Sequence, residues 1–203
     1  MKLYFTRHGE SQANIERIIS NRDLPHPLTD KGRTQAIALA DRLVEATIGA
    51  IYASPILRAQ QTAQIIGERL GLPVQTSDAL REFDCGVMEG KGTAEAWAAH
   101  EAVITAWANH DYAQCISGGE SFADMQQRFA PFVNQLVAQY AQQTTAVLLV
   151  SHGSLLHHML PLVLQNVDGE FVAQHPLRNC ACVCATVNQN SIACTDWDGL
   201  GMQ

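Results

Sequence analysis

The chain has 203 residues, of which 47% are hydrophobic and 16% are charged, a composition close to the globular average. This length suits one globular domain, and the composition excludes wholesale disorder. Acidic residues outnumber Lys and Arg by 20 to 13, so the formal net charge is −7. An acidic balance argues against a general nucleic-acid or anionic-membrane binder, which needs a basic face. An anionic ligand would have to be held by a local cluster of cations.

The apolar runs of the chain are too short to span a bilayer, which takes about 20 apolar residues. The longest are residues 146–150 and 159–164. The N-terminus has no signal-peptide pattern, because Leu3-Tyr4-Phe5 is followed at once by polar residues. The six cysteines have no framework spacing, which favours free thiols in a reducing compartment. We therefore expect a cytoplasmic protein.

Predicted strands and helices alternate along the chain. The expected strands are residues 2–6, 50–53, 74–76, 146–150 and 181–187, and the expected helices are 29–47, 54–70, 121–140 and 155–164. The second helix is predicted to begin with Ser54 as its cap and Pro55 at its first position, and to stop at Gly71. This order predicts an α/β fold with a mostly parallel central sheet and helices on both faces. We expect a single domain over residues 1–203, with a helical insertion at about 88–118 over the C-terminal edge of the sheet.

Polar residues follow three of the predicted strands. They are Arg7-His8-Gly9, Ser54 with Arg58, and Ser151-His152-Gly153. Ligands of open α/β sheets bind outside the carboxyl ends of the strands, so two histidines and two arginines would meet at one rim. Each guanidinium can fork onto two phosphate oxygens, and glycines such as Gly153 let the backbone approach and bind the ligand closely. The pattern predicts a site for a phosphate group.

A phosphate site with a histidine can also be catalytic. A neutral histidine is a competent nucleophile, and arginines can spread the charge of the transition state. An alkoxide leaving group also needs a proton donor, which contributes on the order of 10²- to 10⁴-fold. The candidates are Glu82 and Asp84, and if Glu82 instead pairs with Arg81, the acid would be Asp84.

Six segments match the motifs of one family, in the family's order. They are Arg7-His8-Gly9-Glu10-Ser11 with Asn14, Leu28-Thr29 with Gly32 and Gln35-Ala36, Tyr52-Ala53-Ser54-Pro55 with Arg58-Ala59, Leu80-Arg81-Glu82 with Gly86, Gly118-Gly119-Glu120-Ser121, and Val150-Ser151-His152-Gly153. The chain resembles the histidine phosphatase superfamily, the phosphoglycerate mutase-like proteins, over nearly its whole length. A lone Arg-His-Gly triplet would be weak support, whereas six ordered segments are specific.

The resemblance implies a cofactor-free enzyme of the histidine acid phosphatase type. His8 would carry the phosphoryl group in a covalent intermediate, and Glu82 would donate the proton and later activate water. The other implied contacts to the phosphate are Arg7, Arg58, His152, Asn14, Ser20 and Asn21. The family uses no metal for this reaction, and the sequence shows no zinc-like ligand spacing.

The family contains both mutases and phosphatases. Similar mutases carry a Trp before the Asn, and this chain has Ala13 at that position. Those mutases also bind the glycerate carboxylate with basic residues of the insertion. In this chain Lys91 is the only Lys or Arg between residues 82 and 127. We therefore expect a phosphatase that hydrolyses small phosphomonoesters, whose organic part meets the region of Trp97 and Trp107. The alternatives are phosphoglycerate mutase-type phosphoryl transfer and a non-catalytic phosphate-binding module. The expected partner is a small phosphorylated metabolite, and we expect no binding to nucleic acid or to a membrane. The sequence leaves the oligomeric state open, and a homodimer is one of the possibilities.

Three further groups of residues have a competing interpretation. His157 and His158 suggest a metal site, but neighbours on a helix point about 100° apart, which favours packing or surface roles. Cys180, Cys182 and Cys184 would lie on one face of a strand, where small buried side chains are more frequent than a zinc site. Trp97 and Trp107 are more often packing residues than a substrate platform. His100 has no partner spacing, and we assign it no role.

Overall fold

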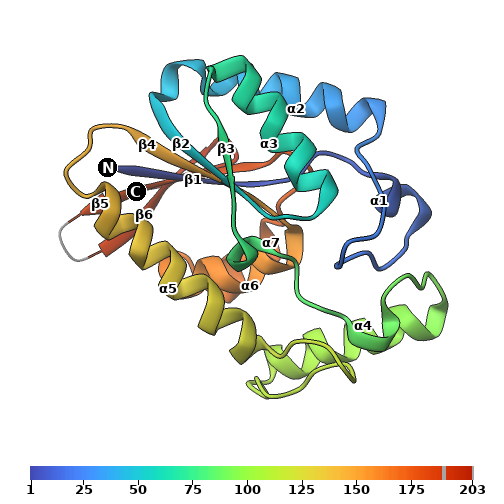
Figure 1. Ribbon diagram of the computed structural model, residues 1–203. Helices are drawn as coiled ribbons and strands as arrows, with labels where there is room; N and C mark the ends of the chain where they lie inside the picture. The colour runs from blue at the N-terminus through green and yellow to red at the C-terminus, as the bar shows by residue number, and fades with distance from the viewer. Residues whose placement is uncertain (189–190, 203) are drawn as a thin grey trace.

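A seven-stranded sheet forms the centre of the computed structural model, which describes residues 1–188 and 191–202 (Figure 1). The strands are β1 (Lys2–Arg7), β2 (Ile48–Ala53), β3 (Val74–Thr76), β4 (Ala146–Ser151), β5 (Cys182–Asn188), β6 (Ser191–Trp197) and β7 (Leu200–Gly201), in the order β3-β2-β4-β1-β5-β6-β7. The first four strands of this order pair in parallel, and the last three join them antiparallel. The expected α/β fold is confirmed, with a parallel half that carries the predicted strand ends.

Helices cover both faces of the sheet (Figure 1). The upper face in the figure carries α2 (Asp30–Leu43) and α3 (Leu57–Leu70), and the lower face carries α5 (Phe122–Tyr140) and α6 (Gly153–Val163). The shorter helices are α1 (Gln12–Glu16), α7 (Gly169–Gln174) and the 3-10 turns Val44–Ala46, Asp78–Leu80 and Gly86–Met88. Both chain ends lie on the left of the figure, on the side opposite α1.

Strand β4 shows how the sheet separates two cores. All six of its residues are buried. Val147 and Leu149 belong to the core under α5 and α6, whereas Leu148 and Val150 belong to the core under α2 and α3. Successive side chains of a strand point to opposite faces, so a continuous apolar run fits a strand that is covered on both sides.

The structure corrects the predicted start of one helix. Thr29 caps α2 as expected, since its side chain accepts a hydrogen bond from Gly32 N. Helix α3, however, begins at Leu57 and not at Ser54-Pro55, although it ends at the left-handed Gly71 as predicted. Ser54 does not cap this helix because its hydroxyl is hydrogen-bonded to the His152 ring. Helices α1 and α7 and strands β6 and β7 were not predicted.

The expected insertion contains one long helix, α4 (Ala94–Ala108), which lies near α1 at the lower right of Figure 1. Backbone hydrogen bonds tie the chain before α4 to the loop after α1, from Ile19 N to Lys91 O and from Gly90 N to Ile19 O. The Trp97 indole Nε1 also donates to Arg17 O at 2.8 Å. These bonds fix α4 above the carboxyl ends of the parallel strands, as one wall of a cavity.

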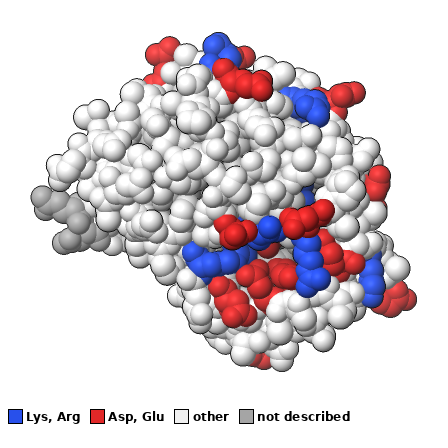
Figure 2. All heavy atoms as spheres, in the orientation of Figure 1, with Lys and Arg blue, Asp and Glu red and all other residues white. Residues whose placement is uncertain are grey.

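The charged side chains are mixed on the face shown in Figure 2. Acidic and basic groups are interleaved on its lower part, and most of the rest of this face is uncharged. Ion pairs between neighbouring charges include Arg22 with Asp84 at 2.9 Å and Arg128 with Glu120 at 2.8 Å. In residues 1–188 and 191–202, no helix has the length and apolar character needed to cross a membrane.

Five of the six cysteines are packed in the interior. All six are free thiols. Burial raises the pKa of Cys180 and of Cys182 to about 12, so both thiols stay protonated at neutral pH. Among the described residues, no group of three or more His, Cys, Asp or Glu side chains could hold a metal ion. For Cys180, Cys182 and Cys184 the geometry therefore agrees with the packing interpretation.

Candidate active site

Strands β1, β2 and β4 end at the same rim of the sheet. Their parallel register aligns Arg7 with Ser151 and Ala53 with Val150. The chain then turns into the site, where His8 N donates to Ser151 O at 3.0 Å. A cavity of about 530 Å³ opens above this rim. The polar residues that follow these three strands meet at this cavity, as the sequence predicted.

The His8 ring lines the cavity and is hydrogen-bonded to Arg58 there. Its ring Nε2 accepts a hydrogen bond of 2.9 Å from Arg58 Nε, which can only donate, so Nδ1 carries the proton and donates it to Gly9 O at 2.7 Å. Burial, with the charges of Arg58 and Arg7, holds the pKa of His8 well below 6.5. The imidazole is therefore neutral at neutral pH, the state in which Nε2 is a nucleophile.

Two arginines supply positive charge beside His8. Arg58 is 4% exposed, and its Nη1 donates to Ser20 O at 2.6 Å. Burial lowers its pKa to about 10, which still leaves the guanidinium charged at neutral pH. Arg7 donates to Leu177 O at 2.9 Å, and its buried Nε has no partner. A Cβ at Gly153 would lie 3.2 Å from that Nε, so the glycine gives the guanidinium room. Unpaired N–H groups beside a cavity favour an anion there.

His152 lies behind His8, with its ring centroid 5.2 Å from that of His8. Its Nε2 forms a 2.7 Å hydrogen bond with Ser54 Oγ, whereas its buried Nδ1 has no partner. Burial, with the charges of Arg58 and His8, holds the pKa of His152 well below 6.5. A buried polar atom without a partner is costly, so His152 Nδ1 is a further contact open to a bound anion.

Glu82 lines the cavity and is held at the start of α6. Its carboxylate accepts hydrogen bonds from Leu155 N at 2.7 Å, Ser154 N at 2.9 Å and Phe83 N at 3.1 Å. The loop that carries it is anchored by Arg128, which donates to Ala79 O at 2.9 Å and forms an ion pair with Glu120. Glu82 is 8% exposed and thus shielded from bulk solvent.

The structure brings the predicted site residues together. Of the predicted site residues, those that line the cavity are Arg7, His8, Asn14, Ser20, Asn21, Arg58, Glu82 and Gly153. The His152 ring packs against that of His8. Asn14 Oδ1 accepts from Ser11 N and Asn179 Nδ2, and Asn21 Nδ2 donates to Phe83 O. These bonds hold both amides at the cavity wall.

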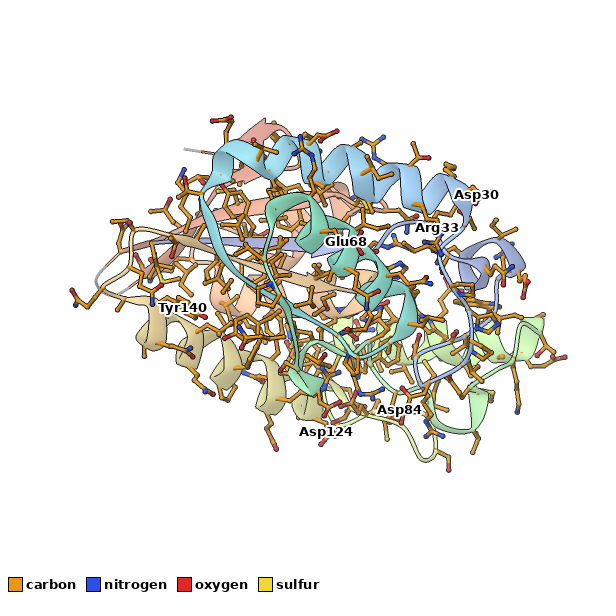
Figure 3. The ribbon with its side chains drawn as sticks, turned by 45° about the horizontal axis from the view of Figure 1, so that its top comes forward. Asp30, Arg33, Glu68, Asp84, Asp124 and Tyr140 are labelled. Carbon is orange, nitrogen blue, oxygen red and sulfur yellow. The ribbon has the colours of Figure 1, made fainter. Side chains whose placement is uncertain are left out.

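The alternative acid, Asp84, lies outside the cavity lining. It pairs with Arg22 and accepts from Gly86 N at 2.7 Å, on the side of the molecule where Asp124 marks the start of α5 (Figure 3). Arg81 pairs with Asp78 and Asp23 and not with Glu82. The geometry thus favours Glu82 over Asp84 as the carboxylate that faces a ligand.

Sequence reasoning missed one wall of the cavity. His100, His157 and His158 all line it together with Trp97, although the sequence assigned no role to the first and expected packing or surface positions for the other two. His158 also packs on Trp107, with ring centroids 5.2 Å apart. Trp107 is buried and does not line the cavity, so its packing interpretation agrees with the structure. The spacing of Trp97 and His100, one helical turn apart, is the signal that could have placed both on one face.

Buried neutral histidines predict a loss of stability in acid. The pKa of His8 and of His152 lies well below 6.5, and burial lowers the pKa of His158 to about 3. Below about pH 6.5 the unfolded chain binds protons at these rings and the folded chain does not, so the free energy of unfolding falls with falling pH. Urea midpoints should decrease from pH 7.5 to 5.5, with a smaller decrease in H158Q. Equal midpoints over this range would contradict the prediction, and H110A at an exposed histidine is the control.

Comparison with known proteins identifies relatives of this site. The family model described as histidine phosphatase superfamily (branch 1) matches residues 3–198. A glucosyl-3-phosphoglycerate phosphatase of Mycolicibacterium vanbaalenii is 34% identical over 76% of this chain and 70% of that protein. A Salmonella choleraesuis protein named "Probable phosphoglycerate mutase GpmB" is 31% identical over 89% of this chain and 82% of that protein. The solved structure of a mycobacterial glucosyl-3-phosphoglycerate phosphatase complexed with VO3 superposes with a TM-score of 0.82, at 28% identity over 97% of this chain and 98% of that one. The chain belongs to the histidine phosphatase superfamily, branch 1.

Proposed function

We propose that this protein is a metal-independent phosphomonoesterase of the histidine acid phosphatase type that acts on small phosphate esters through a phosphohistidine on His8. The observation that carries the proposal is the neutral His8, whose ring lines a cavity beside two charged arginines. Arg7 Nε and His152 Nδ1 are both buried without partners, and a phosphate group would accept from Arg7 Nε and, in the tautomer whose Nε2 accepts from Ser54 Oγ, from His152 Nδ1.

The first chemical step would transfer the phosphoryl group to His8. Phosphate oxygens take over the Arg58 N–H, which frees His8 Nε2 to attack phosphorus as the ester P–O bond breaks. Glu82 gives its proton to the departing alkoxide oxygen, so the alcohol leaves neutral. The arginines stabilise the charge on the equatorial oxygens.

The second step would return His8 to its neutral state. Glu82, now a carboxylate, removes a proton from a water molecule whose oxygen attacks phosphorus. The P–N bond then breaks, inorganic phosphate is released, and Glu82 holds the proton for the next turnover. One group serves as acid and then as base, as microscopic reversibility allows for a two-step displacement.

Phosphoryl transfer to a glycerate acceptor is the competing activity. Ala13 and not a Trp lines the cavity before Asn14, and Lys91, the only Lys or Arg between residues 82 and 127, is exposed and outside the lining. The arrangement therefore supports water over a bound carboxylic acid as the acceptor.

The test of the proposed function is phosphate release from a panel of phosphomonoesters with a metal chelator present. We expect release at the same rate with and without chelator, because Arg7 and Arg58 supply the positive charge. Phosphoglycerates in the panel are also followed for isomerised product. Loss of release on chelation would contradict metal independence, and isomerisation without release would identify a mutase.

A further inference from the structure

The cavity is larger than its phosphate end requires. Its volume of about 530 Å³ lies in the range of sites that enclose drug-sized molecules. Arg7, His8, Arg58 and Glu82 make up the catalytic part of the lining, and the other part comes from α4, the loop after α1, the first turns of α6 and the chain around Leu177. The organic part of a substrate would lie in this second part, which we call the outer chamber.

The outer chamber offers little charge to a ligand. Among the described residues that line the cavity, Arg17 is the only charged side chain besides Arg7, Arg58 and Glu82. Burial lowers the pKa of His100 and of His157, so these rings are neutral at neutral pH. Apolar residues of the remaining wall include Ile18, Ile104 and Leu177.

Flat rings make up the α4 side of the outer chamber. The Trp97 ring is held in place by its 2.8 Å hydrogen bond to Arg17 O, and its centroid lies 5.3 Å from that of His100. His100 is supported from behind by Phe83, at 5.1 Å. Phe83 in turn packs on the buried Trp107 at 5.1 Å. The two cavity rings are thus fixed before any ligand arrives, which keeps the entropy cost of binding low.

We propose, on the basis of the proposed function, that the preferred substrates are phosphate monoesters of alcohols that carry a flat, uncharged ring, and that Trp97 and His100 form the surface on which this ring lies. Aromatic pairs gain stacking energy beyond the area that they bury. An ammonium in the same place would lose its hydration beside Arg17, a charge of the same sign, which is unfavourable for an unpaired cation. The outer chamber therefore selects against charged alcohols such as serine.

The test compares kcat/KM for 2-phenylethyl, 2-cyclohexylethyl and ethyl phosphate, with phosphoserine as a charged ester. The three uncharged esters release primary alkoxides of similar basicity, so differences report the fit of the organic part. We expect the phenyl ester to exceed ethyl phosphate by about tenfold or more, and to exceed the cyclohexyl ester. The ratio of phenyl to ethyl ester should fall by about tenfold in W97A and be retained in W97F, which keeps a flat ring.

Each result decides a separate claim. Equal kcat/KM for the phenyl and cyclohexyl esters, or a preference for phosphoserine, would overturn the ring proposal while leaving phosphatase activity intact. Absence of release from every ester would contradict the proposed function. Calorimetric binding of the same esters to H8A would then still test the ring proposal. Tighter binding of the phenyl ester to H8A, lost in the double variant H8A/W97A, would support the proposal. Equal binding of all the esters would overturn it.

Discussion

Replacing His8 with alanine is expected to lower phosphate release by on the order of 10⁴-fold or more, because no other group can accept the phosphoryl group. Among the described residues, His8 is the one imidazole that both lines the cavity and lies within hydrogen-bond distance of Arg58. His152 cannot replace it, since its Nε2 is bonded to Ser54 and its ring lies behind that of His8. The measurement is initial rates of phosphate release from one ester by wild-type enzyme and H8A at equal concentration.

Two observations separate a lost nucleophile from a damaged fold. H8A leaves the buried Arg58 Nε without its acceptor, so its urea midpoint should fall, yet the variant should still unfold in one cooperative transition. Quenching the wild-type reaction in alkali should trap a phosphorylated histidine that is absent from H8A. H110A, at an exposed histidine outside the cavity lining, is the matched control and should keep wild-type rates. Unchanged turnover in H8A would refute the phosphohistidine mechanism.

The sequence predicted the rim of the site because local signals and topology agree there. Each parallel strand is a short apolar run that ends in reactive residues, and parallel strands bring such ends to one edge. Arg7, His8 and His152 were therefore located without any knowledge of side-chain contacts. The left-handed end of α3 at Gly71 was equally local, since glycine takes this conformation without strain.

The parts that were missed depend on contacts between distant segments. Ser54 has the sequence of a helix cap, yet its hydroxyl bonds to His152, 98 residues further along the chain. The outer chamber exists because the Trp97 indole bonds to Arg17 O, a contact across 80 residues. The contact between α4 and the segment of Arg17 brings His100 to the same cavity as His157. The position of His100 in the cavity wall could therefore not be predicted from spacing along the chain.

Replacing Glu82 with glutamine is expected to lower kcat/KM for ethyl phosphate by about 10²- to 10⁴-fold, the contribution of a positioned acid. The loss should be much smaller for p-nitrophenyl phosphate, because its leaving group departs without a proton. Hydrolysis of the phosphohistidine still needs Glu82 as a base for either ester. With p-nitrophenyl phosphate, E82Q should therefore release a stoichiometric burst of nitrophenolate followed by slow turnover, measured by rapid-mixing absorbance.

The leaving-group comparison also separates catalysis from structure in this variant. A glutamine has one acceptor oxygen where Glu82 accepts from both Ser154 N and Leu155 N, so E82Q leaves one backbone N–H unpaired and loses some stability. Structural damage alone would lower kcat/KM for both esters by the same factor and give no burst. E68Q, at an exposed carboxylate on α3 (Figure 3), is the control for removal of one charge. Equal losses for the two esters in E82Q would mean that the proton comes from another group, and the wall of the cavity that carries Glu82 would then serve only to hold the substrate.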